Sequence, residues 1–181
     1  MKDTKQAGVS YTATLPLSWY EAGTMASGKI EHWQHVNISL LHALATVEAM
    51  AGDREKELGL AAKAYERLEA KVDVMLDMLG RLLAERTETP PEHPLTLWAN
   101  GLDWLDKNVP EVGHEIVICL YLSQKLPQPL MLTASVQSCV QEGDSTRVQC
   151  VFTHLNAELT EWLERTVFRY HRRAVHHMQA R

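Results

Sequence analysis

The stretch DREKELGLAAKAYERLEAKVDVMLDMLGRLLAER, residues 53–86, decides how the rest of the chain is organised. From Leu58 onward its apolar residues recur in alternating steps of three and four, which is typical of positions a and d of a coiled coil. At 1.5 Å per residue this helix would be about 50 Å long, longer than a small domain is wide. We therefore expect something outside its own domain to cover the apolar stripe, which consists of Leu58, Ala61, Tyr65, Leu68, Val72, Met75, Leu79 and Leu82.

The number of helices in the assembly is indicated by the residues beside this stripe. Leu76 and Leu83 at e positions and Met78 at a g position widen it, and a two-stranded coil would leave much of their surface wet. We predict a wider bundle, with a homotetramer preferred. The helix around residues 33–47 of the same chain is an alternative cover, and the few e and g charges, such as Glu69 and Lys71, specify neither parallel nor antiparallel packing.

Composition narrows the class of protein. The chain has 181 residues, 45% of them hydrophobic, and a formal charge of -5, so it can build a core and has no global attraction to nucleic acid. Its three cysteines, Cys119, Cys139 and Cys150, form no CxxC pair, which favours free thiols over disulfides or zinc. No apolar run approaches the ~20 residues that span a bilayer, and no signal peptide is recognisable at residues 1–17. We expect a cytoplasmic protein with no membrane insertion.

The first half of the chain predicts one strand and two helices. Residues 9–19 are rich in β-branched and aromatic residues, and Pro16 would confine them to an edge strand or a strand start. An amphipathic helix follows from about Ile30 to Gly52, and Asp53 is a good N-cap for the heptad helix, 53–86. We interpret residues 28–89 as a helical hairpin that ends before Pro90.

The second half changes character. Residues 95–153 contain short β-branched runs separated by turn residues, which predicts a small antiparallel sheet or barrel, with Cys119 as core filler. Asn156 would cap a final helix, 156–179, whose apolar face is Leu159, Trp162, Leu163, Val167, Tyr170 and Ala174. The predicted fold class is α+β, a small antiparallel β-barrel interrupted by two long α-helices and completed by a C-terminal helix.

Residues 96–152 resemble a PilZ domain, the small β-barrel that many bacteria use as a receptor for cyclic di-GMP. Gly101 stands where the glycine of the family's D/N-x-S-x-x-G motif belongs, residues 109–113 match its P-x-x-x-G loop, and residues 130–152 match its paired strands. The resemblance implies that residues 9–19 are the first barrel strand and that the helical hairpin is inserted in the domain. With these inserted helices the chain resembles an atypical branch of the family, whose members self-associate through such helices.

The departures from the family pattern fall on its ligand site. Thr96 replaces the Asp or Asn of the motif, and Trp98 replaces its Ser. The family's R-x-x-x-R run ahead of the first strand is also missing, because no arginine precedes Arg54. Each charge-assisted bond lost to a phosphate removes about 1.5–3 kcal/mol, so we predict no cofactor and weak or absent cyclic di-GMP binding at the motif positions Thr96, Trp98 and Gly101.

Other sites have little support. His32 and His35 lie three apart, and His171, His176 and His177 cluster late, but no third ligand is placed with them, so we expect no metal. The basic residues Arg165, Arg169, Arg172, Arg173 and Arg181 follow a helical spacing, which we interpret as a solvated or protein-binding face and not a nucleic-acid site. No Walker A, G-x-S-x-G or H-E-x-x-H motif occurs, so the sequence predicts no enzyme and no catalytic residues.

These observations lead to one functional hypothesis and one alternative. The first is a non-enzymatic regulatory adaptor in cyclic di-GMP signalling, in motility, pilus or virulence control, which tetramerises through its coiled coil and binds a protein partner. The alternative is a genuine cyclic di-GMP receptor that uses residues outside the family motif, such as Arg172 and Arg173 across a subunit boundary.

Overall fold

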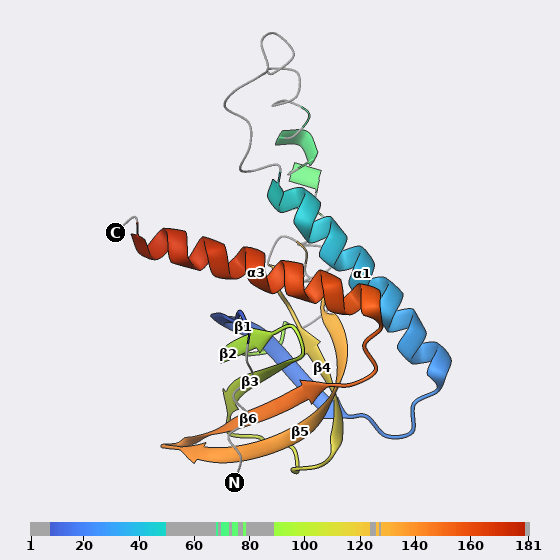
Figure 1. Cartoon of the computed structure of the whole chain (residues 1–181), viewed down its shortest axis with the longest axis vertical. Helices are drawn as coiled ribbons and strands as arrows, with labels where there is room; N and C mark the ends of the chain where they lie inside the picture. Colours follow the sequence, from blue (N-terminus) through green and yellow to red (C-terminus); the bar gives the residue numbers. More distant parts are fainter. Residues whose placement is uncertain are drawn as a thin grey trace.

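A computed structural model describes residues 8–49, 68, 70–72, 74, 75, 78, 89–123, 126 and 128–179. These residues form a β-barrel with two long helices against it (Figure 1). The elements are, in chain order, β1 (Tyr11–Glu21), α1 (Ser27–Ala49), β2 (Glu92–Trp98), β3 (Gly101–Asp106), β4 (Glu115–Leu120), β5 (Leu130–Glu142), β6 (Ser145–Phe152) and α3 (Ala157–Gln179).

The six strands close into an antiparallel barrel in the order β1-β2-β3-β6-β5-β4. Closure depends on β1, whose first half pairs with β2 and whose second half pairs with β4. β1 and β2 are paired in the barrel but separated in the chain by the segment that contains α1. The barrel is therefore interrupted by this helical segment. The predicted barrel fold is therefore confirmed.

Pro16 lies where β1 changes partners, which corrects the expectation of an edge strand or strand start. The Leu17 N–H donates to the Pro91 carbonyl at 3.1 Å, and the Tyr121 N–H donates to the Pro16 carbonyl at 3.1 Å. At such a switch the missing proline N–H breaks no continuous ladder. A proline in the interior of a strand is tolerated here because each half of β1 has a different neighbour.

The core fills the barrel and continues under the helices. Alternate residues of each strand point inward, as a half-buried strand requires. Trp104 on β3 is the largest fully buried side chain among the described residues, and Cys150 on β6 is buried in the same core cluster. Cys119 was expected in the core, but it lies partly exposed outside the core cluster, on the opposite face of β4 from Ile118 and Leu120.

Helix α1 is held against the barrel by a pair of hydrogen bonds within its otherwise apolar buried face. Asn37 is fully buried, and its side-chain amide donates to the Met131 carbonyl at 2.8 Å while its Oδ1 accepts from the Met131 N–H at 3.0 Å. Leu40, Leu41 and Leu44 are buried around the same face.

Helix α3 lies across the barrel and against α1 (Figure 1). The Asn156 Oδ1 accepts from the Leu159 N–H at 2.7 Å, so the predicted N-cap is confirmed. Leu159, Leu163, Val167 and Tyr170 are buried as predicted, while Trp162 and Ala174 are half-buried. The Tyr11 and Tyr170 ring centroids lie 5.0 Å apart, which joins the second half of α3 to the start of β1.

Most of the predicted heptad helix lies outside the described residues. This holds for Leu58, Ala61, Tyr65, Leu76, Leu79, Leu82 and Leu83. Leu68, Val72 and Met75 are described as helical and are exposed within one chain, with 59% of Leu68 and 62% of Met75 accessible. Val74 and Met78 beside them are exposed as well.

Candidate functional site

The outer face of β2, β3 and β6 contains the positions to which the family resemblance assigns ligand binding. Thr96 and Trp98 alternate on β2 with the buried residues Leu95 and Leu97, so both side chains point away from the core. Gly101 opens β3 directly opposite Trp98, after a two-residue turn. The structure thus brings the three predicted positions together at one end of the β2–β3 hairpin.

Thr96 belongs to a polar row that crosses the strands. Its register partners are Thr12 on β1 and Asp103 on β3, and Asp103 is in turn opposite Gln149 on β6. The Thr12 hydroxyl donates to the Thr96 hydroxyl at 3.5 Å, a long hydrogen bond, and Thr96 is also hydrogen-bonded to Asp103. The hydroxyl of Thr96 therefore bonds to its own chain.

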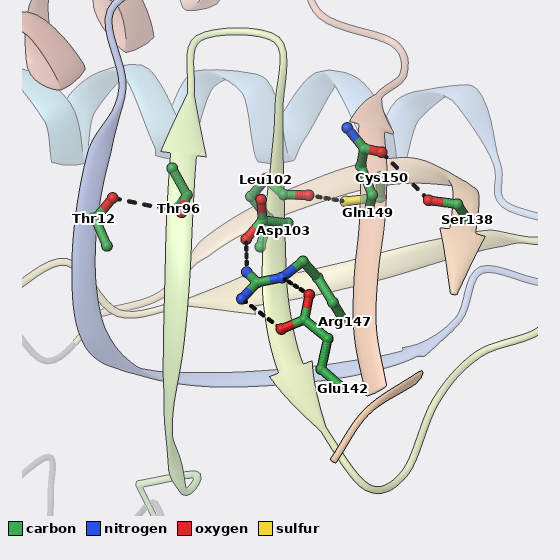
Figure 2. Close-up of polar contacts among 9 residues, drawn as sticks. All are labelled: Thr12, Thr96, Leu102, Asp103, Ser138, Glu142, Arg147, Gln149 and Cys150. Atoms are coloured by element: carbon green, nitrogen blue, oxygen red, sulfur yellow. Dashed lines mark hydrogen bonds and ion pairs between the residues drawn. The ribbon is translucent and has the colours of Figure 1, made fainter. Parts of the chain in front are cut away.

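Arg147 on β6 contributes a positive charge to this face, and two carboxylates of the same chain hold it (Figure 2). Its Nη1 donates to the Asp103 Oδ1 at 2.7 Å, while its Nε and Nη2 donate to the two Glu142 oxygens at 2.7 Å and 3.0 Å. This bidentate geometry is the one that a guanidinium also offers to a phosphate. Because Glu142 accepts from Nε and Nη2 and Asp103 accepts from Nη1, an anion would have to compete with two carboxylates for Arg147.

Burial and charge shift the titration of these three groups in different directions. Burial raises the pKa of Asp103, whose side chain is 14% exposed, although the nearby Arg147 guanidinium acts to lower it. The hydrogen bonds from Arg147 lower the pKa of Glu142, and the Glu142 carboxylate raises the pKa of Arg147 above its ordinary value. The network therefore holds the guanidinium charged.

The segment just ahead of β1 is where the family carries its arginine pair. Here the Ser10 carbonyl accepts a hydrogen bond from the His171 Nδ1–H of α3 at 2.8 Å. His171 thus serves as a contact between helix and strand. Ser10 therefore contacts α3, next to the Tyr11 and Tyr170 rings, which are tilted at 53° to each other.

A pocket with a volume of about 490 Å³ lies at the start of α1, and its lining does not include Thr96, Trp98 or Gly101. Its wall contains His154, whose backbone has a φ of 54° and whose Nε2 lies 3.2 Å from the Glu115 Oε1. Gln34 donates to the His154 carbonyl, and the Asn156 amide donates to the Gln34 Oε1 at 3.2 Å. These bonds fix the entry to α3.

The other candidate residues do not converge. Within the described ranges, no three His, Cys, Asp or Glu side chains come together as metal ligands. On α3, Arg165 bonds to Glu161 at 2.5 Å, and Arg172 lies over the Phe168 ring at 5.9 Å. Among the described helices, none has the length and apolar character needed to cross a membrane.

Sequence reasoning missed the Asp103–Arg147–Glu142 network. The alternation of buried and outward residues on β3 and β6 could have placed Asp103 and Arg147 on the face that carries Thr96. Their pairing depends on the order of strands in the closed barrel, because β3 and β6 are neighbours in space but far apart in sequence.

Comparisons with known proteins agree with this architecture. Residues 41–181 match the family model described as an atypical PilZ domain, cyclic di-GMP receptor. The chain is also similar to a pathogenic protein from Xanthomonas campestris, at 25% identity and a TM-score of 0.75 over 93% of this chain and 91% of that one. That structure was described as a new tetrameric PilZ domain self-assembled via an unusual helical bundle. No curated protein matches significantly. The matched residues include β2 to β6, the motif positions Thr96, Trp98 and Gly101, and all of α3. Because the family model covers more than half of the chain, the chain belongs to the atypical PilZ domain family.

Proposed function

We propose that the chain is a non-enzymatic regulatory adaptor in cyclic di-GMP signalling, which binds the nucleotide weakly or not at all and acts through protein contacts. The observation that supports this most is the state of the ligand face. Thr96 bonds to its own neighbours, and the guanidinium of Arg147 on this face is held by Asp103 and Glu142. A doubly charged dinucleotide would have to displace those carboxylates before it gained a phosphate contact.

The second part of the proposal is a homotetramer formed through the heptad helix. Leu68, Val72 and Met75 occupy a and d positions and are exposed in a single chain. Val74 and Met78 extend the exposed apolar surface to a neighbouring side of the same helix, so one partner helix would leave part of it wet. The tetrameric Xanthomonas campestris relative supports the same count.

Assembly would give the adaptor its affinity for a protein partner. Several barrels on one bundle can engage a repeated or clustered target at once, which raises avidity without any new contact in each barrel. The likeness to a family of nucleotide receptors, together with the lack of a catalytic constellation in the sequence, supports a non-enzymatic role.

Titration calorimetry with cyclic di-GMP tests the ligand part of the proposal. We expect no saturable heat in the low micromolar range for the wild-type protein, and the same result for Arg147→Ala, because the family's arginine pair is missing in both. Saturable binding to the wild type in that range would contradict the proposal.

The family description favours one alternative, a true receptor that uses residues outside the motif. Arg172 and Arg173 are exposed on α3, the helix that packs on β1 and β2. If the calorimetric signal is present, the Arg172→Ala/Arg173→Ala variant should abolish it on this alternative and leave the oligomer intact. Retention of binding in that variant would overturn the alternative.

A further inference from the structure

The charged residues of α3 are segregated along its length. Glu158, Glu161 and Glu164 lie in its first half and are exposed, and no Asp or Glu follows as far as Gln179. The second half contains Arg172, which is exposed. Arg165 is the exception in the first half, and it is paired with Glu161. The outer face of the helix is therefore acidic at one end and basic at the other.

Phe168 lies at the midpoint of this 23-residue helix, and 50% of it is exposed. The helix dipole accounts for acidic residues early in a helix and basic ones late, but it gives no reason for an aromatic side chain at the centre of the outer face. Glu161, Glu164, Phe168 and Arg172 share that face at helical spacing, opposite the buried Leu163 and Tyr170.

We propose that this face of α3, which consists of Glu161, Glu164, Phe168 and Arg172, binds the same face of a second copy in antiparallel orientation. A two-fold axis then passes between the two Phe168 rings. Glu164 and Arg172 lie four residues to either side of Phe168, so each Glu164 is level with the partner's Arg172. Parallel packing would instead place like charges level with one another, which is destabilising.

The pairing is too small to hold two chains together alone. One aromatic contact and two exposed ion pairs of about 0–1 kcal/mol each fall well short of a stable interface of about 1,000 Å². The inference therefore rests on the proposed function, in which the heptad helices hold the chains together and raise the effective concentration of the second contact. Figure 1 shows α3 lying on the outside of the barrel, with its C-terminal end extending beyond the strands. The contact would then fix how barrels of one assembly are oriented.

A disulfide test distinguishes antiparallel from parallel pairing in the full chain. In a Cys119→Ser/Cys139→Ser background, which leaves only the buried Cys150, the Glu164→Cys/Arg172→Cys variant should form disulfide-linked dimers under mild oxidation. A bond within one chain is excluded, because the two positions lie about 12 Å apart along the helix and a disulfide needs Cα atoms within about 7 Å. The Glu164→Cys and Arg172→Cys single variants are the matched controls, and each should stay largely monomeric on a non-reducing gel.

Charge reversal at Glu164 and Arg172 provides the second measurement, because the double reversal exchanges the two charges and keeps the ion pairs. In the same background Phe168→Cys should link to itself across the two-fold axis. Adding Glu164→Arg or Arg172→Glu should lower the yield severalfold, and adding both should restore it, because the exchanged charges again match. These are exposed positions, and the melting temperature of each variant checks that it folds.

The outcomes separate this inference from the proposed function. If the double cysteine variant gives no linked dimer, or if the single variants link as efficiently as the double one, the antiparallel pairing is overturned. Sedimentation of the wild type reports on the heptad assembly independently. A tetrameric wild type whose double cysteine variant forms no disulfide overturns the α3 pairing alone. A monomeric wild type overturns the heptad assembly, and with it the effective concentration on which the α3 contact depends.

Discussion

The Arg147 Nη1 atom lies 2.7 Å from the Asp103 Oδ1 atom, across the β3–β6 pair on the outer face of the barrel. Asp103 is mostly buried, and Arg147 extends from it to Glu142 near the end of β5. The guanidinium that shares Asp103 with the motif position Thr96 thus has a structural role within the chain. The same contact links β3 to β6 and places a carboxylate in competition with any phosphate for this guanidinium.

Removing this guanidinium should destabilise the protein. We expect Arg147→Ala to lower the free energy of unfolding by about 1–3 kcal/mol in urea titrations, because it leaves the mostly buried Asp103 carboxylate without its charged partner. Glu142→Gln is the matched control, since Arg147 still bonds to Asp103 there, and its loss should be smaller. Equal losses of unfolding free energy in the two variants would show that the Arg147–Asp103 contact does not add to the stability of the protein.

The acid dependence of stability should differ between the two carboxylates. The pKa of Glu142 is lowered from 4.5, so its stabilising contribution is present above that value and is lost as the pH falls through the lowered folded-state pKa. The pKa of Asp103 is raised from 3.8, so its charged form costs stability that grows as the pH rises from there through the raised value.

Urea titrations at a series of acidic pH values can measure both effects. The stability of the wild type relative to Glu142→Gln should increase with pH in this range, and its stability relative to Asp103→Asn should decrease. Two differences of the same sign would contradict the assignment of opposite pKa shifts to the two carboxylates.

Asn37 should be more important to stability than its polarity suggests. Asn37→Leu would leave the Met131 N–H and carbonyl without the bonds that the amide provides, and we expect a loss of about 2 kcal/mol or more. Ser39→Ala on the exposed side of α1 is the control and should change the unfolding free energy by at most about 0.5 kcal/mol. If Asn37→Leu were neutral, α1 would not depend on this contact with β5.

The thiols should react slowly in the folded state. Burial raises the pKa of Cys150 to about 12, and it also raises the pKa of Cys119 and of Cys139. Because the thiolate is the reactive form, labelling with a thiol reagent at neutral pH should leave Cys150 unmodified until the protein unfolds. Rapid native labelling of Cys150, located by mass spectrometry, would contradict the burial of β6.

Much of the fold follows from local patterns, while the ligand face depends on long-range pairing. The alternation in β2 to β6, the N-cap Asn156 and the buried stripe of α3 all follow from rules that act within a few residues. Pro16 was misjudged because its tolerance depends on β1 changing partners from β2 to β4. The Arg147 network and the Asn37–Met131 contact could not be predicted, since each joins residues that only the closed barrel and the docked helix bring together.

The central claim is that the chain is an assembly built on the heptad helix, and sedimentation equilibrium tests it most directly. We predict a mass of about 82 kDa for the wild type, four times the 20.5 kDa of one chain. Leu68→Asp should reduce this mass, because a charge buried in the seam is too costly to accommodate. Ala70→Asp, an exposed position of the same helix outside the heptad stripe, should leave it unchanged. A wild-type mass near 20.5 kDa, or a Leu68→Asp variant with the wild-type mass, would contradict the account.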